Sequence, residues 1–468
     1  MKESVIDPAF LVAWDHCYQR NSAVISDTVM QHARRSWFDT LAASAGGVSE
    51  RCTQAALQAC TVSGSEALHP WDIALVLGTA SHALDYDDVC MLATCHPSAP
   101  PISALLAFLP VLSKERADLQ WGDILSAYLV GTETTLRLGQ WLGFRHYALG
   151  FHATGTLGVI GAAAACAHAL KLPLGQARAA LSIAASSSSG LRANFGTDVK
   201  PLHVGFAAAS AVRAVLLAQA GANASDDVWD SAGFPHAYNG GQPPLPLPWT
   251  IGMPWAIESP GFEHKRYPSC YLTHRLIAGI TAIRAQQPAH ARGLPVQIEV
   301  EFPRNGLAPL KYPIPGTGLE AKFSGPYCAA AAWVDGNVGL ASFSDSAVQR
   351  ETVRSQMNRV VLRERTEDGE RLESAPVHVT VRGPEWTSAM RVDWAPGSIA
   401  DPMSRDQLLT KWRDCVANGG MALDEAAVVR LLDAPLQTGV IALLAPLRKA
   451  LLAGIRPAFF KPKKDSYD

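Results

Sequence analysis

The chain has few charged residues and no excess of either sign. Of its 468 residues, 18% are Asp, Glu, Lys or Arg, and 40 basic residues against 42 acidic ones leave a formal net charge of −2. A nucleic-acid-binding protein needs surplus positive charge to neutralise phosphates, so we expect no nucleic-acid partner. The charged fraction lies below the roughly 25% of an ordinary soluble chain, which predicts large buried cores and a subunit interface.

Several motifs of common enzyme classes are also absent. The sequence has no Gly-x4-Gly-Lys-Ser/Thr phosphate-binding loop, no His-Glu-x-x-His zinc motif and no Gly-x-Ser-x-Gly nucleophile turn. Its nine cysteines are scattered and form no Cys-x-x-Cys pair that would hold zinc. We therefore expect no metal, no disulfide framework and a reducing compartment, the cytoplasm.

No segment is expected to enter or cross a membrane. Residues Met1–Asp15 carry four charges and no long apolar run, so they do not resemble a signal peptide. The most apolar stretches, Gly155–Leu172 and Val204–Ala220, are rich in Ala and Gly and are interrupted by His168 and Arg213. A membrane span needs about 20 strongly apolar residues, so we predict that both stretches are buried helices.

The first 260 residues have the pattern of packed helices. Ser26 or Asp27 can cap a helix whose apolar residues recur every four positions from Val29 to Leu41, and a Gly-Gly pair ends it. Further helices are predicted at Trp71–Leu84, Trp121–Leu138, Thr156–Leu170, Gly175–Ser186 and Gly205–Ala220.

The pattern changes after Asn239, where Gly240, Gly241 and five prolines between residues 243 and 254 predict an irregular connection. A helix and alternating apolar strands follow, and Ser404 and Gln407 have capping-box spacing where helices resume. The helix is predicted at Tyr271–Arg284, and the strands at Val296–Phe302, Arg359–Arg363, Val377–Val381 and Arg391–Trp394. We predict a mainly α fold, with a large all-helical domain (residues 1–261 and 399–468) and an inserted smaller α+β lid domain (262–398).

Residues capable of chemistry gather first at the end of a predicted helix. His82, Asp85 and Asp88 lie three residues apart and would share one helix face, and His96 follows shortly after. A carboxylate beside a histidine favours the imidazolium and orients the ring, as acid–base catalysis requires. Two other interpretations stay open: a solvated helix end, or a Mg²⁺ site on the Asp-x-Asp-Asp string, which also occurs as the acid motif of class II terpene cyclases.

A second cluster combines His152 with Lys200 and His203. Lys200 is predicted to lie in a loop that Gly196 opens and Pro201 ends, whereas surface lysines usually lie on helices. An ordinary solvated lysine is the alternative interpretation. Together the three side chains would offer two imidazoles and one ammonium group to a ligand.

The third cluster lies at the predicted domain boundary, where Lys265 and Arg266 precede a proline-containing turn into a helix. The helix N-terminus would add partial positive charge for an anion, and clefts between domains are frequent ligand sites. Cys270 beside His274 could act as a nucleophile. A basic linker and an ordinary thiol at a helix start are the alternatives.

The three clusters supply cations and imidazoles on a nearly neutral chain. This combination suits a small substrate with two or three carboxylates, and proton transfer at a carbon next to one of them. Such a step develops negative charge on a carboxylate, which fixed donors stabilise by about 3–4 kcal/mol each. A positioned acid or base contributes about 10²–10⁴ in rate.

Five strings, in order, carry a resemblance to a known family. They are HALDYDD…HP, GFHATGTLGVIGAAAA, NFGTDVKPLH, KRYPSCYLTH and AKFSGPYCAAA. With PGSIADPM and WRDC, they resemble the MmgE/PrpD family over nearly the whole chain. The resemblance implies a helical domain with a lid-like α+β domain, a homodimer and no cofactor. Activities known in the family are 2-methylcitrate dehydratase, cis-aconitate decarboxylase and iminodisuccinate epimerase.

The resemblance also implies individual site residues. It places the active-site aspartate at Asp85, the acid–base histidine at His96 and a second histidine at His152. It places a loop lysine at Lys200 and a boundary lysine at Lys265. Further candidates are Tyr327 for catalysis and, for substrate binding, His203, Arg266, His274 and Cys270.

We therefore predict a cofactor-independent lyase that acts on a small di- or tricarboxylate such as 2-methylcitrate, with dehydration as the favoured reaction. His96, held by Asp85, would be the main acid or base, and the two lysines would bind carboxylates. Decarboxylation, epimerisation and a non-catalytic helical binding scaffold are the alternatives. Val89 and Cys270 stand where decarboxylases of the family have Thr and His, which weighs against decarboxylation. The Pro-Ser-Cys-Tyr-x-x-His string is similar to that of iminodisuccinate epimerases, which keeps epimerisation open.

Overall fold

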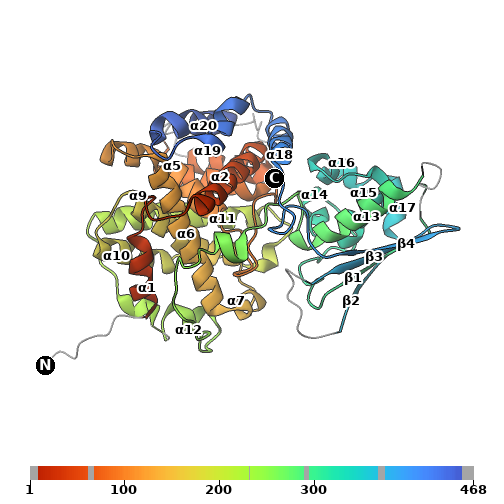
Figure 1. The fold of residues 1–468 in the computed structure, drawn as a ribbon, viewed down its shortest axis with the longest axis horizontal. Helices are drawn as coiled ribbons and strands as arrows, with labels where there is room; N and C mark the ends of the chain where they lie inside the picture. The colour runs from red at the N-terminus through yellow and green to blue at the C-terminus, as the bar shows by residue number, and fades with distance from the viewer. Residues whose placement is uncertain are drawn as a thin grey trace, which may run out of the picture.

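The molecule consists of a larger helical body and a smaller body with a four-stranded sheet (Figure 1). The computed structural model describes residues 9–61, 68–230, 232–288, 293, 295–366 and 375–455. Each body has its own hydrophobic core, and the C-terminal helices return to the core of the larger one. The predicted mainly α fold with a smaller α+β part is confirmed.

The larger body is made of helices, and the sequence pattern predicts seven of the fifteen given below for the described ranges. The first long one is capped as expected, because the Ser26 hydroxyl accepts a hydrogen bond from the Val29 backbone N–H at 3.4 Å. The helices of this body are α1 (Ala9–Tyr18), α2 (Asp27–Gly47), α3 (Arg51–Thr61), α4 (Pro70–Ala83), α5 (Ala99–Glu115), α6 (Trp121–Leu142), α7 (Phe144–Ala148), α8 (Ala153–Thr156), α9 (Gly158–Ala169), α10 (Leu174–Ala185), α11 (Val199–Gln219), α12 (Phe234–Tyr238), α18 (Arg405–Asn418), α19 (Glu425–Asp433) and α20 (Val440–Gly454). The seven predicted helices are α2, α4, α6, α9, α10, α11 and α18.

Helices α4 and α11 approach each other closely. A Cβ added to Gly78 would lie 2.8 Å from the Cα of Gly205, and a Cβ added to Gly205 would lie 2.4 Å from the carbonyl oxygen of Leu75. Only glycine permits this backbone contact. The contact sets the end of α4 beside the first turn of α11, which matters for the site described below.

Helix α11 is, within the described part of the chain, the one helix that length and composition would allow to cross a membrane. In the structure, 67% of its apolar window is buried, and its neighbours are α4, α9 and α10. A helix that is apolar on most sides is expected where it packs on several others. The predicted buried helix at Val204–Ala220 is confirmed.

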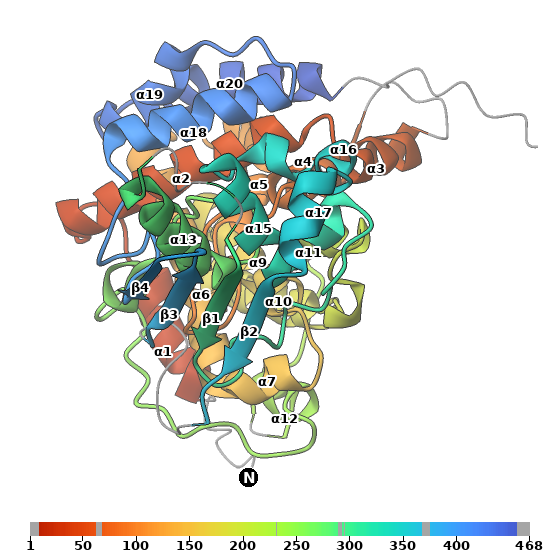
Figure 2. The same ribbon diagram turned by 90° about the vertical axis from the view of Figure 1, so that its right-hand side faces the viewer.

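The smaller body packs helices on one face of a sheet (Figure 2). Its strands lie in the order β2-β1-β3-β4, with β1 parallel to β2 and antiparallel to β3. The elements are α13 (His274–Gln286), β1 (Gln297–Phe302), α14 (Gly318–Ala321), α15 (Gly325–Asp335), α16 (Asp345–Val348), α17 (Glu351–Met357), β2 (Val360–Glu364), β3 (Val377–Arg382) and β4 (Thr387–Val392).

The alternating residues of β1 and β3 bury one face, as predicted. In the register, Ile298 lies opposite Val381 and Val300 lies opposite Val379. The last strand begins earlier than the predicted Arg391–Trp394, because β4 is an edge strand without buried residues and its apolar alternation is weak.

Candidate active site

The chain turns sharply after α4, and this turn separates the acidic residues of the first cluster. Helix α4 ends at Ala83, and Asp85 has a left-handed backbone with φ 53°. The prediction that His82, Asp85 and Asp88 share one helix face is therefore wrong. A left-handed residue breaks the helical repeat and sends the following side chains in other directions.

Asp85 is held by two lysines that lie far away in sequence. Its Oδ1 accepts hydrogen bonds from Lys200 Nζ at 2.6 Å and from Lys265 Nζ at 2.9 Å. All three side chains are buried. Burial alone would raise the pKa of Asp85, but the two ammonium groups hold it well below its usual range. The three groups together carry one net positive charge.

Lys200 does not lie in a loop, as predicted, but in the first turn of α11. Pro201 does not end a loop here, because proline is tolerated where a helix begins and its backbone N–H has no helical partner. The close packing of α4 and α11 then places the Lys200 ammonium group beside the residues that follow α4.

His96 lies closer to Asp87 than to Asp85. Its Nδ1 is 3.2 Å from Asp87 Oδ2, and its Nε2 is 3.6 Å from Asp85 Oδ1. Asp87 also accepts a hydrogen bond from Nδ1 of the buried His82 at 2.9 Å, so its carboxylate contacts both imidazole rings. The carboxylate that orients His96 is thus Asp87, which the sequence interpretation did not assign to this role. The Asp-x-Asp spacing of Asp85 and Asp87 is the sequence feature that could have pointed to Asp87 as a second site carboxylate.

The imidazoles of the site are shifted toward the neutral form. Burial lowers the pKa of His96, although Asp87 opposes the shift, and burial lowers the pKa of His82 to about 3. Burial and the neighbouring His82 and Lys200 hold the pKa of His152 well below its usual range. These rings are mainly neutral at pH 7 before a ligand binds.

His152 and His203 form a pair of rings, with their Nδ1 atoms 3.0 Å apart. One nitrogen must donate and the other accept, which fixes complementary tautomers. The His152 ring also lies edge-on to Phe195. His152 lines the cavity, whereas His203 supports it from α11.

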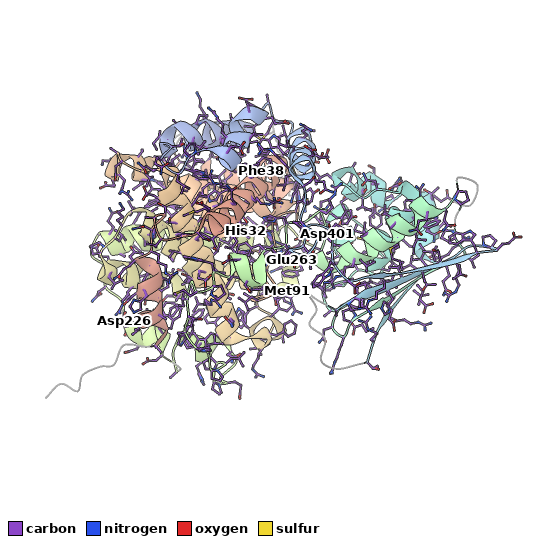
Figure 3. All side chains as sticks on the ribbon, viewed as in Figure 1. His32, Phe38, Met91, Asp226, Glu263 and Asp401 are labelled. Carbon is purple, nitrogen blue, oxygen red and sulfur yellow. The ribbon has the colours of Figure 1, made fainter. Side chains whose placement is uncertain are left out.

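One cavity brings together most of the predicted catalytic residues. Its polar lining includes Asp85, His96, His152, Lys200 and Lys265. Its other walls are mainly apolar and include Val89, Met91, Tyr147, Phe195, Leu272 and Phe323. Figure 3 shows Met91 near Glu263, where the larger body faces the smaller one. A largely apolar cavity with a few convergent charges is the usual form of a small-molecule site.

Other predicted residues lie outside this cavity. Tyr327 is in the core of the smaller body, where its hydroxyl donates to the Ser342 carbonyl. His274 is buried between the rings of Tyr267 and Tyr271. Arg266 is partly exposed and does not line the cavity. The structure therefore does not bring the side chains of Tyr327, His274 and Arg266 to the site.

Cys270 lines the cavity, but its environment does not favour a nucleophile. Burial raises the pKa of its thiol to about 11, so the reactive thiolate is scarce at pH 7. Val89 lines the same cavity. Val89 and Cys270 stand at the two positions where the resemblance expects Thr and His, so the cavity wall is less polar at these positions.

Four side chains could offer ligand atoms to a metal ion: His82, Asp85, Asp87 and His96, whose nearest donor atoms lie within 4.8 Å of one another. The donor set does not fit a divalent cation well. Two ammonium groups already bind Asp85 Oδ1, and their charge would repel a dication. Asp87 is likewise engaged by His82.

Comparison with known proteins gives consistent matches over most of the chain. The model of the MmgE/PrpD N-terminal domain matches residues 15–246, and that of the MmgE/PrpD C-terminal domain matches residues 267–434. The chain is 30% identical over 361 residues to the cis-aconitate decarboxylase of Homo sapiens, covering 72% of this chain and 73% of that protein. It is 25% identical over 461 residues to the cis-aconitate decarboxylase of Aspergillus terreus, covering 91% and 92%.

Proposed function

Because the chain belongs to the MmgE/PrpD family, we propose that it is a cofactor-independent lyase that decarboxylates an unsaturated tricarboxylate, with cis-aconitate as the model substrate. It is a lyase of the MmgE/PrpD type, like the decarboxylases that it resembles. The sequence pattern favoured dehydration. The similarity to decarboxylases from an animal and a fungus favours loss of CO₂ instead.

The observation that carries the proposal is the pair of ammonium groups on one buried carboxylate beside neutral imidazoles. Lys200 and Lys265 leave a net positive charge after Asp85 is counted. In a mostly apolar cavity this charge favours an anion, and ammonium groups bind carboxylates through charge-assisted hydrogen bonds. Substrate carboxylates would lie against the two lysines.

The reaction can be written with all atoms accounted for. The carboxylate on the CH₂ arm of cis-aconitate leaves as CO₂, and the electron pair of the broken C–C bond forms a new terminal double bond. The electrons of the old double bond move to the carbon that bears another carboxylate, and that carbon takes up a proton. The product is methylenesuccinate. Negative charge on the neighbouring carboxylate would be stabilised by Lys200 and Lys265.

His96 would donate this proton, with Asp87 orienting the ring. Its side chain is 11% exposed, so it is accessible from the cavity while most of it is packed. The negative charge of a bound tricarboxylate raises the pKa of a nearby imidazole, so the substrate itself would favour the protonated donor. His152 would be the second proton-transfer group.

The pH dependence of kcat/KM is expected to distinguish decarboxylation from dehydration. The pKa of His96 lies below its usual 6.5 in the free enzyme. If His96 donates the proton, kcat/KM falls by about tenfold per pH unit as the pH rises above this pKa. If His96 removes a proton, kcat/KM instead falls as the pH drops below it. Initial rates from pH 5 to 8.5 in one mixed buffer give the answer.

The proposed function is tested by one NMR time course in D₂O with EDTA present. The panel is cis-aconitate, citrate, 2-methylcitrate and iminodisuccinate. We expect cis-aconitate to yield CO₂ and methylenesuccinate with one deuterium, at a rate that EDTA does not change. Loss of water from citrate or 2-methylcitrate would indicate a dehydratase, and deuterium exchange alone an epimerase. A thermal shift without turnover would support a binding scaffold.

A further inference from the structure

Three buried lysines donate to three consecutive carbonyl groups around Asp85. The ammonium groups of Lys322, Lys265 and Lys411 donate, in that order, to the carbonyl oxygens of residues 84, 85 and 86. Each of these lysines is at most 4% exposed. Only Lys265 is among the site residues predicted from the sequence, so Lys322 and Lys411 have no assigned role.

Lys322 reaches the segment of residues 84–86 from the smaller body. It lies between α14 and α15, and its ammonium group crosses to the carbonyl of Leu84 in the larger body. Within the described ranges, no carboxylate forms an ion pair with it. Burial lowers its pKa to about 8, although the charges of Glu50 and Asp85 oppose the shift, and Lys200 and Lys265 add to it. A buried ammonium group without a carboxylate partner is costly, so a purely structural use is a poor explanation.

Lys411 reaches the segment of residues 84–86 from helix α18 of the larger body. It lies on α18 and binds Asp39 Oδ1 at 2.7 Å and the Tyr86 carbonyl at 2.6 Å. It also donates to the backbone carbonyl of Lys265 at 3.0 Å. One ammonium group therefore connects the chain after Asp85 to the segment that carries the second site lysine.

We propose that Lys322 and Lys411 are positioning residues that hold the backbone on both sides of Asp85. They fix its carboxylate toward Lys200 and Lys265. A left-handed aspartate is uncommon and persists where its surroundings determine it. Leu84 is the C-cap of α4, so its carbonyl lacks a helical partner and attracts a cation, and the carbonyls of the next two residues lie outside the helix. The lysines hold the left-handed backbone of Asp85 in place and supply hydrogen-bond donors to the neighbouring carbonyl groups. Because Lys322 belongs to the smaller body, the geometry of the site depends on the docking of that body.

The kinetic test rests on the proposed function and uses Lys322, because its removal leaves no buried carboxylate unpaired. A displacement of about 1 Å at a catalytic group costs about 100-fold, so we expect Lys322→Ala to lower kcat/KM by about 10–100-fold. Lys322 lines a second cavity of about 550 Å³ between the two bodies, which gives small amines access. Ethylammonium should restore activity about fivefold or more, because it replaces the lost donor. Tetramethylammonium, which has no N–H group, should not.

Two variants separate positioning from simple docking of the bodies. Lys311 also donates across them, to the carbonyls of Arg192 and Ala193 at 3.2 and 3.4 Å, so Lys311→Ala is the matched control and should keep full activity. If Lys322→Ala fails to fold, Lys322→Met and Lys322→Arg take its place. We expect Met to lose activity and Arg, which keeps a charged donor, to retain most of it.

The outcomes distinguish this inference from the proposed function. An inactive wild-type enzyme would overturn the proposed function, and calorimetric binding of propane-1,2,3-tricarboxylate would then replace turnover as the readout. Weaker binding by the Lys322 variants would still support positioning. A folded Lys322→Ala enzyme with wild-type kcat/KM or affinity, or a loss that ethylammonium does not restore, would overturn the positioning role.

Discussion

Replacing His96 with Asn lowers kcat by about 10²–10⁴-fold, which is the usual loss when a positioned acid or base is removed. Asn is of similar size and polar, so the packing around Asp87 should survive. KM should change little, because the carboxylates are bound by Lys200 and Lys265 rather than by the imidazole. Steady-state formation of methylenesuccinate gives both constants.

The matched control for this variant is His378→Asn. His378 lies on β3, where it pairs with Glu301 at 3.2 Å on the partly exposed side of the sheet, outside the cavity. It should retain wild-type activity. If His96→Asn keeps kcat within tenfold of the wild type, the proton comes from another group, and His152 becomes the leading candidate.

Replacing Lys200 with Met lowers kcat/KM by about 10²–10³-fold, as expected for the loss of one preorganised donor to developing negative charge. Among the described residues, the Lys200 side chain makes one hydrogen bond, to Asp85, and Lys265 continues to bind that carboxylate, so the fold should persist. The loss should appear in both KM and kcat, because the ammonium group contacts the substrate before and during the reaction. Exposed Lys114→Met is the control.

A double-mutant cycle with Asp85→Asn shows whether the ammonium group acts through the carboxylate. If Asp85 orients Lys200, the two changes together cost less than the sum of the single costs. Additive losses would mean that the two groups act independently. Wild-type kcat/KM in Lys200→Met would contradict the proposed role of this lysine in substrate binding.

Local sequence patterns predicted the capped or strongly periodic elements of this fold, because caps and periodicity are local properties, but they missed several helices, including α5, α15 and α20. Ser26 caps α2 and Ser404 caps α18, and the alternation in β1 and β3 matches their buried face. The exposed edge strand β4 was placed less accurately, because its residues lack an apolar pattern.

The candidate site was predicted only in part, since its geometry depends on contacts between distant segments. The resemblance selected Asp85, Lys200 and Lys265, but no spacing rule brings together residues 115 and 180 positions apart. The role of Asp87 depends on the left-handed backbone of Asp85, which periodicity does not reveal. Tyr327 belongs to a matching motif, yet its hydroxyl is used inside the smaller body.

The most direct test of the account is a crystal structure with bound propane-1,2,3-tricarboxylate, a saturated acid that cannot react by the proposed route. We expect two of its carboxylates to lie within about 3.5 Å of Lys200 Nζ and Lys265 Nζ, with a carbon chain atom near the His96 ring. The apolar wall around Met91 would cover the rest of the ligand. An acid bound elsewhere, or one that leaves both ammonium groups uncontacted, would contradict the account.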